Sequence, residues 1–181
     1  VPGAAFAHVA TLMRDAAAVI GQHEGLYSDV PEVAEIPQKP LWRHAPAAMA
    51  AALHSAGFRA VGLASNVASP ARQIARTVAA LDAAGIAHAG IGHDREAARR
   101  PARIEVAGVR LGLLSYTSVF WPVGHAATAD APGCATIRAH TAYQPGRRAL
   151  EMPGDPPLVV TWADPEELAA IPAPELSAGK A

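Results

Sequence analysis

The sequence predicts an α/β fold in which a mostly parallel sheet is flanked by helices. Three observations predict it: short apolar runs alternate with stretches of helical periodicity, glycine and proline separate them, and polar residues gather where apolar runs end. With 181 residues and a hydrophobic fraction of 51%, the chain can bury a core of its own. We therefore expect a single α/β domain over residues 1–171, followed by a loose tail over residues 172–181.

The first elements are a helix, a short strand and a long loop. Residues 6–17 place apolar side chains at helical spacing, and residues 18–20 form a short apolar run that predicts a buried strand. Residues 27–43 contain several prolines and predict a loop. Pro46 suits the first turn of the next helix, which Gly57 ends.

The centre of the chain repeats the alternation of strand and helix. Residues 59–63 predict a buried strand, and a second short strand is expected at residues 87–89. Between them, Ser69 suits an N-cap and Pro70 the first turn of a helix that Gly85 ends.

A small helix and a hairpin follow. Residues 94–100 predict the helix, and apolar runs at residues 104–106 and 109–114 flank Ala107 and Gly108. A short turn between two such runs indicates a β-hairpin.

The last part of the chain is dominated by a predicted loop. Residues 118–157 are rich in Pro, Gly, Thr and His without a sustained period, which predicts a long functional loop. Residues 158–161 predict a last strand, and Asp164 followed by Pro165 opens a last helix that ends at residue 170.

Composition excludes several classes of protein. A net charge of −1 gives no support to nucleic acid or acidic lipid as a partner, and the single cysteine excludes a disulfide framework. No stretch approaches the roughly 18–20 apolar residues that span a bilayer, so we expect no membrane segment. The first residues lack a signal peptide's basic start and apolar run. We expect a soluble chain, cytoplasmic or exported after removal of a leader that precedes residue 1.

Polar side chains follow two of the predicted buried strands. Glu24 lies in the Gln22-His23-Glu24 segment after the first strand, and Asn66 follows Ser65 after the second. The carboxyl ends of parallel strands meet at one sheet edge, and carboxylate and amide oxygens suit a divalent cation there. The alternative is that Glu24 caps a turn and Asn66 braces a loop by an Asx-type bond.

The long loop carries two further candidates, Arg138 and His140. A guanidinium binds carboxylate or phosphate in a bidentate way, so Arg138 suits an anionic substrate, although it can equally pin the loop to backbone carbonyls. The histidines can be read as a substitute metal set, with His23, His88, His93, His125 and His140 as its candidates. Their spacings match no zinc signature, and we expect them to be solvated or loop-bracing instead. Cys134 has no basic neighbour in the sequence, so we do not expect a reactive thiol.

Several stretches of this sequence resemble those of one protein family in the same order. Residues 56–66 (AGFRAVGLASN) are similar to its "AGFDVVSLANNH" stretch, and residues 108–116 (GVRLGLLSY) to its "GVRIGFLAYT". Further likenesses lie at residues 81–86, 90–92 and 96–101 ("LDAAGI…GAG…EARRP") and at residues 131–143, a stretch found in one bacterial subgroup. From residue 6 to residue 171, the chain resembles the CapA-type proteins of poly-γ-glutamate capsule biosynthesis.

The resemblance implies a partial metallophosphoesterase-like fold with a centre for Mn, Zn or Fe at the strand ends. Gln22-His23-Glu24 matches the family's Gln-x-Glu motif, so Glu24 inherits a metal-ligand role, and Asn66 matches the Asn of an Asn-His motif. Val67 stands where that His is expected. An early Gly-Asp would lie upstream of Val1, and a late His-Trp-Gly beyond Ala181.

The implied function is a role in synthesis of poly-γ-glutamate or a related capsule polymer, with an anionic polymer or phosphoester as substrate. The matching subgroup stretch makes Arg138 and His140 candidate substrate-binding or loop-anchoring residues. Two metal ligands are too few for a catalytic centre, which leaves open whether this chain binds a cation at all. Either the chain is a fragment, which the abrupt ends favour, or it is a degenerate, non-catalytic binding or assembly module on the same scaffold.

Overall fold

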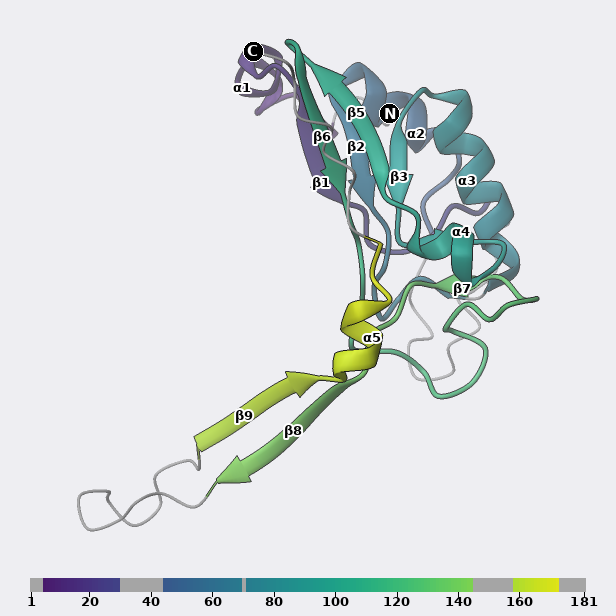
Figure 1. The fold of residues 1–181 in the computed structure, drawn as a ribbon. Helices are drawn as coiled ribbons and strands as arrows, with labels where there is room; N and C mark the ends of the chain where they lie inside the picture. Colours follow the sequence, from purple (N-terminus) through teal and green to yellow (C-terminus); the bar gives the residue numbers. More distant parts are fainter. Residues whose placement is uncertain (1–4, 30–43, 70, 145–157, 173–181) are drawn as a thin grey trace, which may run out of the picture. The chain divides into compact units, whose positions relative to one another are not determined.

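The computed structural model describes residues 5–29, 44–69, 71–144 and 158–172 (Figure 1). The chain divides into two compact units, of which the larger comprises residues 1–136 with 172–181 and the smaller residues 137–171. The predicted boundary between a domain at 1–171 and a tail at 172–181 stays a prediction, because residues 173–181 lie outside the described residues. No helix in the described ranges is long and apolar enough to cross a bilayer.

The larger unit contains a parallel sheet, helices beside it and two small antiparallel pairings. Its elements are α1 (Ala10–Asp15), β1 (Val19–Gln22), α2 (Met49–Ser55), β2 (Phe58–Gly62), η2 (Ala71–Gln73), α3 (Ile74–Ala83), β3 (Ala87–Ala89), β4 (Ile91–Gly92), α4 (Arg95–Arg99), β5 (Ala102–Val106), β6 (Val109–Leu113) and β7 (Gly133–Cys134). Strands β1, β2 and β3 form the parallel sheet, with β2 in the centre. Helix α2 packs against β2 and α3 against β3, and β5 packs against both strands (Figure 1). The predicted α/β class, with helices flanking a parallel sheet, is confirmed.

The hydrophobic core lies between this sheet and its helices. Helix α3 contributes the apolar face expected from its periodicity, since Ile74 and Leu81 are buried and Val78 packs against them. Leu26 and Tyr27, which follow β1, are also fully enclosed. Burying side chains of this size stabilises a fold by about 1.5–3 kcal/mol each, so the segment after β1 is held firmly by its packing.

The predicted β-hairpin is present as β5 and β6. The two strands pair in register from Ala102 opposite Leu113 to Val106 opposite Val109. Ala107 and Gly108 connect them with φ angles of 51° and 79°, and positive φ at both central residues is the geometry that two-residue hairpin turns prefer.

The expectation of one unbroken loop over residues 118–157 is wrong in part. Strand β7 pairs antiparallel with β4, and β8 (Ala139–Gln144) pairs antiparallel with β9 (Leu158–Ala163) in the smaller unit. The last strand, β9, therefore forms a two-stranded antiparallel ribbon with β8 and does not belong to the parallel sheet. A strand as short as β7 has no readable period, and residues 145–157 lie outside the described residues.

Three predicted helix starts differ from the structure, and the first is the one expected at Pro46, since α2 begins at Met49. The helix expected over residues 6–17 is confined to α1, where Leu12 is 76% exposed. Phe6, before this helix, packs its ring against that of Phe58 at a centroid distance of 5.7 Å. Helix α3 has Gln73 at its N-cap without a side-chain cap, because the 3₁₀ turn η2 precedes it. Ser69 is therefore not its cap. The last helix, α5 (Pro165–Ala169), begins as expected with Asp164 accepting a hydrogen bond from the Glu166 N–H at 2.9 Å.

Candidate functional site

Glu24 and Asn66 both follow strands of the parallel sheet at its carboxyl edge. Glu24 comes soon after Gln22, the last residue of β1, and Asn66 follows the end of β2 at Gly62. Because β1 and β2 are adjacent and parallel, both residues belong to the same edge, and both are exposed. A cation approaching this edge from solvent can reach either side chain. Their role as metal ligands stays a prediction.

The ends of β1 and β2 are tied together by hydrogen bonds. The His23 N–H donates to the Gly62 carbonyl at 2.8 Å, and the Gln22 side-chain amide donates to the Ala64 carbonyl at 3.1 Å. A Cβ on Gly62 would lie 2.6 Å from the Gln22 Oε1 atom and 2.9 Å from the Ser115 hydroxyl, so a larger residue there would displace both side chains. The side chain of Gln22 thus links the end of β1, near Glu24, to the end of β2.

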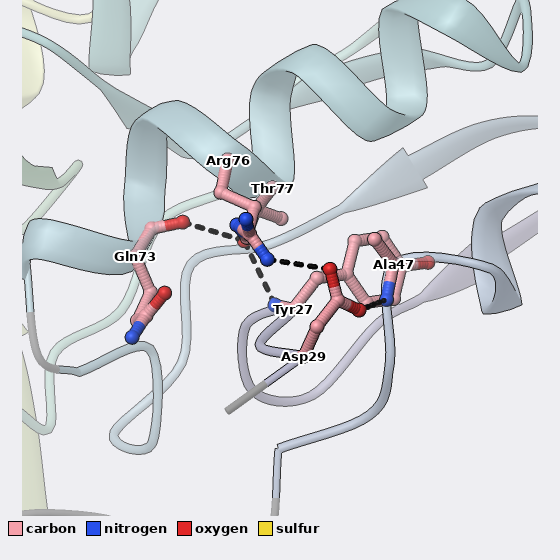
Figure 2. Close-up of polar contacts among 6 residues, drawn as sticks. All are labelled: Tyr27, Asp29, Ala47, Gln73, Arg76 and Thr77. Atoms are coloured by element: carbon pink, nitrogen blue, oxygen red, sulfur yellow. Dashed lines mark hydrogen bonds and ion pairs between the residues drawn. The ribbon is translucent and has the colours of Figure 1, made fainter. Parts of the chain in front are cut away.

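Tyr27, on the segment after Glu24, is anchored to helix α3. Its backbone N–H donates to the Thr77 hydroxyl at 2.8 Å, and that hydroxyl donates to the Gln73 carbonyl at 2.9 Å (Figure 2). Thr77 is 0% exposed, so both of its hydrogen bonds lie in the interior. A threonine within the buried face of a predicted helix was the sequence signal for such an anchor, and sequence analysis did not use it.

Asp29 continues this anchor at the surface. Its carboxylate accepts the Ala47 N–H at 3.0 Å and pairs with the Arg76 guanidinium of α3, as Figure 2 shows. The pair is about half exposed on both sides, so its contribution is small and screened by salt. It links the segment after β1 to helix α3 and to the residues that precede α2.

His125 and Cys134 contact the backbone of the loop that carries Asn66. His125 is 1% exposed, and its Nε2 atom lies 3.0 Å from the Ser65 carbonyl. The thiol of Cys134 donates to the Ala68 carbonyl at 3.7 Å, and burial raises its pKa to about 11. The expectation of a loop-bracing histidine is confirmed at His125, and Cys134 is a buried thiol whose raised pKa keeps it protonated at pH 7.

Val67 lies beside Asn66, at the position where the CapA-type motif has a histidine. Its side chain is 5% exposed and belongs to the interior, while its N–H donates to the Ser65 hydroxyl at 3.3 Å. A residue with this backbone position turns its side chain away from solvent. Neither proton transfer nor cation binding is available from it.

His23, also beside a candidate ligand, packs its ring on Tyr27 at a centroid distance of 4.7 Å. The Nε2 atom of His23 and the hydroxyl of Tyr27 are buried and have no hydrogen-bond partner among the described residues. Burial lowers the pKa of His23 and raises that of Tyr27 to about 12. Both groups are therefore neutral at pH 7. An unsatisfied buried polar atom costs about 1–3 kcal/mol, so this pair is a weak point of the interior.

The other candidate histidines pair with carboxylates or aromatic rings. The Nε2 atom of His88 lies 3.1 Å from Asp82, and that of His93 lies 3.1 Å from Asp94. Within the ranges that the structure covers, no three His, Cys, Asp or Glu side chains gather to hold a metal ion. Glu24 and Asn66 remain the candidate oxygen ligands at the carboxyl edge, and whether they hold a cation stays a prediction.

In the smaller unit, Arg138 and His140 belong to the β8–β9 ribbon and the residues beside it. His140 stands opposite Trp162 in the register, and their rings stack at a centroid distance of 5.9 Å. The Arg138 Nε atom lies 3.8 Å from a Glu167 carboxylate oxygen, and the Arg138 N–H donates to the same carboxylate. Arg138 is thus held by an acidic side chain, and its role toward substrate stays a prediction.

A pocket of about 660 Å³ lies elsewhere in the larger unit, between α3, β4 and α4. Its floor is apolar, with Ile74, Val78 and Ile91, and its rim carries Arg72 and Arg100. None of the residues proposed from the sequence lines it. Cavity size alone therefore does not locate the candidate metal ligands.

The sequence model of the family described as bacterial capsule synthesis protein PGA_cap matches residues 2–167. No curated protein matches the chain. The matched range includes Glu24, Asn66, Arg138 and His140.

Proposed function

Because the chain belongs to the PGA_cap family of bacterial capsule synthesis proteins, we propose that the polymer it serves is poly-γ-glutamate or a related anionic polymer. The family implies a part in capsule biosynthesis, and the match covers residues 2–167 of 181. The CapA-type stretches of the sequence support the narrower choice of polymer. They do so by resemblance, not by contacts with a substrate.

We propose further that the carboxyl edge of β1 and β2 binds this polymer together with a divalent cation. The observation that carries this is the exposure of Glu24 and Asn66 after two adjacent parallel strands. Two oxygen ligands do not hold a cation against water, but hard cations are commonly bound by one or two carboxylates plus oxygens of the substrate. The cation would neutralise charge on the polymer where it meets Glu24. Affinity for metal and affinity for polymer would then depend on each other.

A second candidate is metal-dependent phosphoester hydrolysis, supported by the same two residues and by the resemblance to calcineurin-like metallophosphoesterases. Val67 weighs against it, because its buried apolar side chain replaces the proton donor of the Asn-His motif. With Glu24 and Asn66 as the ligands, we derive no hydrolytic step for this chain.

The experiment that tests the proposal is binding of a fluorescent γ-linked glutamyl oligomer, followed by anisotropy with Mn²⁺ and again with EDTA. We expect retention with Mn²⁺, loss of binding with EDTA, and at least about tenfold weaker binding in Glu24→Gln and Asn66→Ala. Glu96→Gln is the matched control, because Glu96 is exposed on α4 and pairs with Arg100 at 3.5 Å. Binding that survives EDTA or Glu24→Gln unchanged would refute the cation-dependent edge.

A further inference from the structure

A second pocket, of about 580 Å³, lies at the amino-terminal edge of the parallel sheet. It is lined by residues at the starts of β2 and β3 and at the turn of the β5–β6 hairpin, including Arg59, Ala87 and Ala107. Glu24 and Asn66 follow the other ends of the strands, so the pocket is at the opposite edge. A ligand here would not compete with one at Glu24.

Two arginines that line this pocket have side chains without a partner among the described residues. The guanidinium groups of Arg59 of β2 and Arg103 of β5 make no hydrogen bond or ion pair there. Other arginines are engaged, as Arg76 is with Asp29 and Arg138 with Glu167. A guanidinium carries five donors arranged to bind carboxylate or phosphate in a fork, and no described residue accepts from these two groups.

Regular secondary structure positions both of these side chains. β2 and β5 pack against each other, and each arginine is near the start of its strand. Glu105 also lines the pocket and lies on the same face of β5 as Arg103, because alternate residues of a strand share a face. Two positions along a strand are about 6.5–7 Å apart. The residues that line the pocket therefore present two positive charges and one negative charge, while Arg110, opposite Glu105 in the hairpin register, does not line it.

We propose that this pocket binds an acidic amino acid, with its carboxylates on Arg59 and Arg103 and its ammonium group on Glu105. A simple dianion would meet repulsion from Glu105, whereas a molecule with two carboxylates and one ammonium matches all three charges. The volume of about 580 Å³ lies within the range of small-molecule sites. The same charge pattern occurs in a free acidic amino acid and at the amino terminus of an acidic peptide.

The test is calorimetric titration of the whole chain with L-glutamate, glutarate, inorganic phosphate and an amino-terminal γ-glutamyl dipeptide. We expect glutamate to bind at least about tenfold more tightly than glutarate, which lacks the ammonium group. Tighter binding of the dipeptide than of glutamate assigns the source to a peptide terminus, and the reverse order assigns it to the free amino acid. Phosphate or glutarate binding as tightly as glutamate would overturn the proposal.

Variants separate this pocket from general attraction of anions. Arg59→Gln and Arg103→Gln should each weaken glutamate binding at least about tenfold, and Glu105→Gln should abolish the preference for glutamate over glutarate. Arg95→Gln is the control, since Arg95 is exposed at the start of α4 and does not line the pocket. Equal affinities in the wild type and both arginine variants, with folding verified by circular dichroism, would refute the site.

Discussion

His125 holds the carbonyl oxygen of Ser65 at 3.0 Å, and with it the loop that carries Asn66. The other ring nitrogen of His125, Nδ1, accepts the Trp121 N–H at 3.1 Å. A backbone N–H can only donate, so Nδ1 carries no proton, and Nε2 must donate to Ser65. His125 is therefore a neutral imidazole with one fixed tautomer, and it joins the loop after β2 to a segment far along the chain.

Removing this imidazole should destabilise the protein and loosen the Asn66 loop. His125→Ala leaves the Ser65 carbonyl and the Trp121 N–H without their partner and opens a cavity, so we expect a loss of about 2–4 kcal/mol in the free energy of unfolding. Urea denaturation followed by circular dichroism measures it. His93→Ala is the control, because the side chain of His93 is 80% exposed and should change stability by no more than about 0.5 kcal/mol. Equal effects of the two variants would contradict the bracing role.

Stability should fall as the solution becomes acidic. Burial lowers the pKa of His125 and of His23 in the folded protein below the unfolded value of about 6.5. Between the folded and unfolded pKa values the unfolded chain binds more protons, so the contribution of these two histidines to the free energy of unfolding is constant above about pH 7 and declines below about pH 6.5. Urea midpoints at pH 7.5 and pH 5.5 measure the decline.

His125→Gln separates the contribution of His125 from that of His23. The variant has no titrating group at this position, so its stability should decline less steeply with acid, while His23 keeps part of the slope. A decline of the same size in the wild type and in His125→Gln would show that His125 does not titrate on unfolding.

The hydroxyl of Thr77 should contribute to the stability of the fold through its buried hydrogen bond with the Tyr27 N–H. Thr77→Val keeps the shape of the side chain but leaves the buried N–H of Tyr27 without its acceptor, for which we expect a loss of about 1–3 kcal/mol in unfolding free energy. Ser55→Ala is the control, because Ser55 makes an exposed hydrogen bond to the Ala51 carbonyl and should cost no more than about 0.5 kcal/mol. Thermal denaturation compares the two, and a Thr77→Val protein as stable as the wild type would contradict the anchor.

Local patterns predicted those parts of the fold that local physics decides. The β5–β6 turn was predictable because Ala107 and Gly108 separate two apolar runs, and the apolar face of α3 because Ile74, Val78 and Leu81 repeat at helical spacing. The placement of Glu24 and Asn66 after neighbouring strands follows from the same reasoning. Whether they bind a cation is a question that spacing does not answer.

The other parts of the fold and of the candidate site depend on contacts between residues that are far apart in the sequence. His125 meets Ser65 across sixty positions, and Thr77 meets Tyr27 across fifty, so no sequence window contains either contact. The β8–β9 ribbon depends on register between His140 and Trp162, on either side of residues that carry no strand signal. In the sequence, Val67 replaces the histidine of the family's Asn-His motif. Only the structure shows that the side chain at this position is buried in the interior.

We expect this chain to hydrolyse phosphomonoester and phosphodiester probes no faster than a metal-only blank, with Mn²⁺ or Zn²⁺ added. Glu24 and Asn66 alone do not fix a cation without substrate carboxylates, and a neighbouring donor worth on the order of 10²–10³-fold in rate is missing at Val67. Val67→His should not restore turnover, because the side chain at this position is buried and the imidazole would enter the interior. Wild type, Val67→His and Glu24→Ala are assayed side by side with p-nitrophenyl phosphate and its diester across several metals. Metal-dependent turnover in the wild type that Glu24→Ala abolishes would prove this expectation wrong, and would mean that other residues complete a catalytic metal centre.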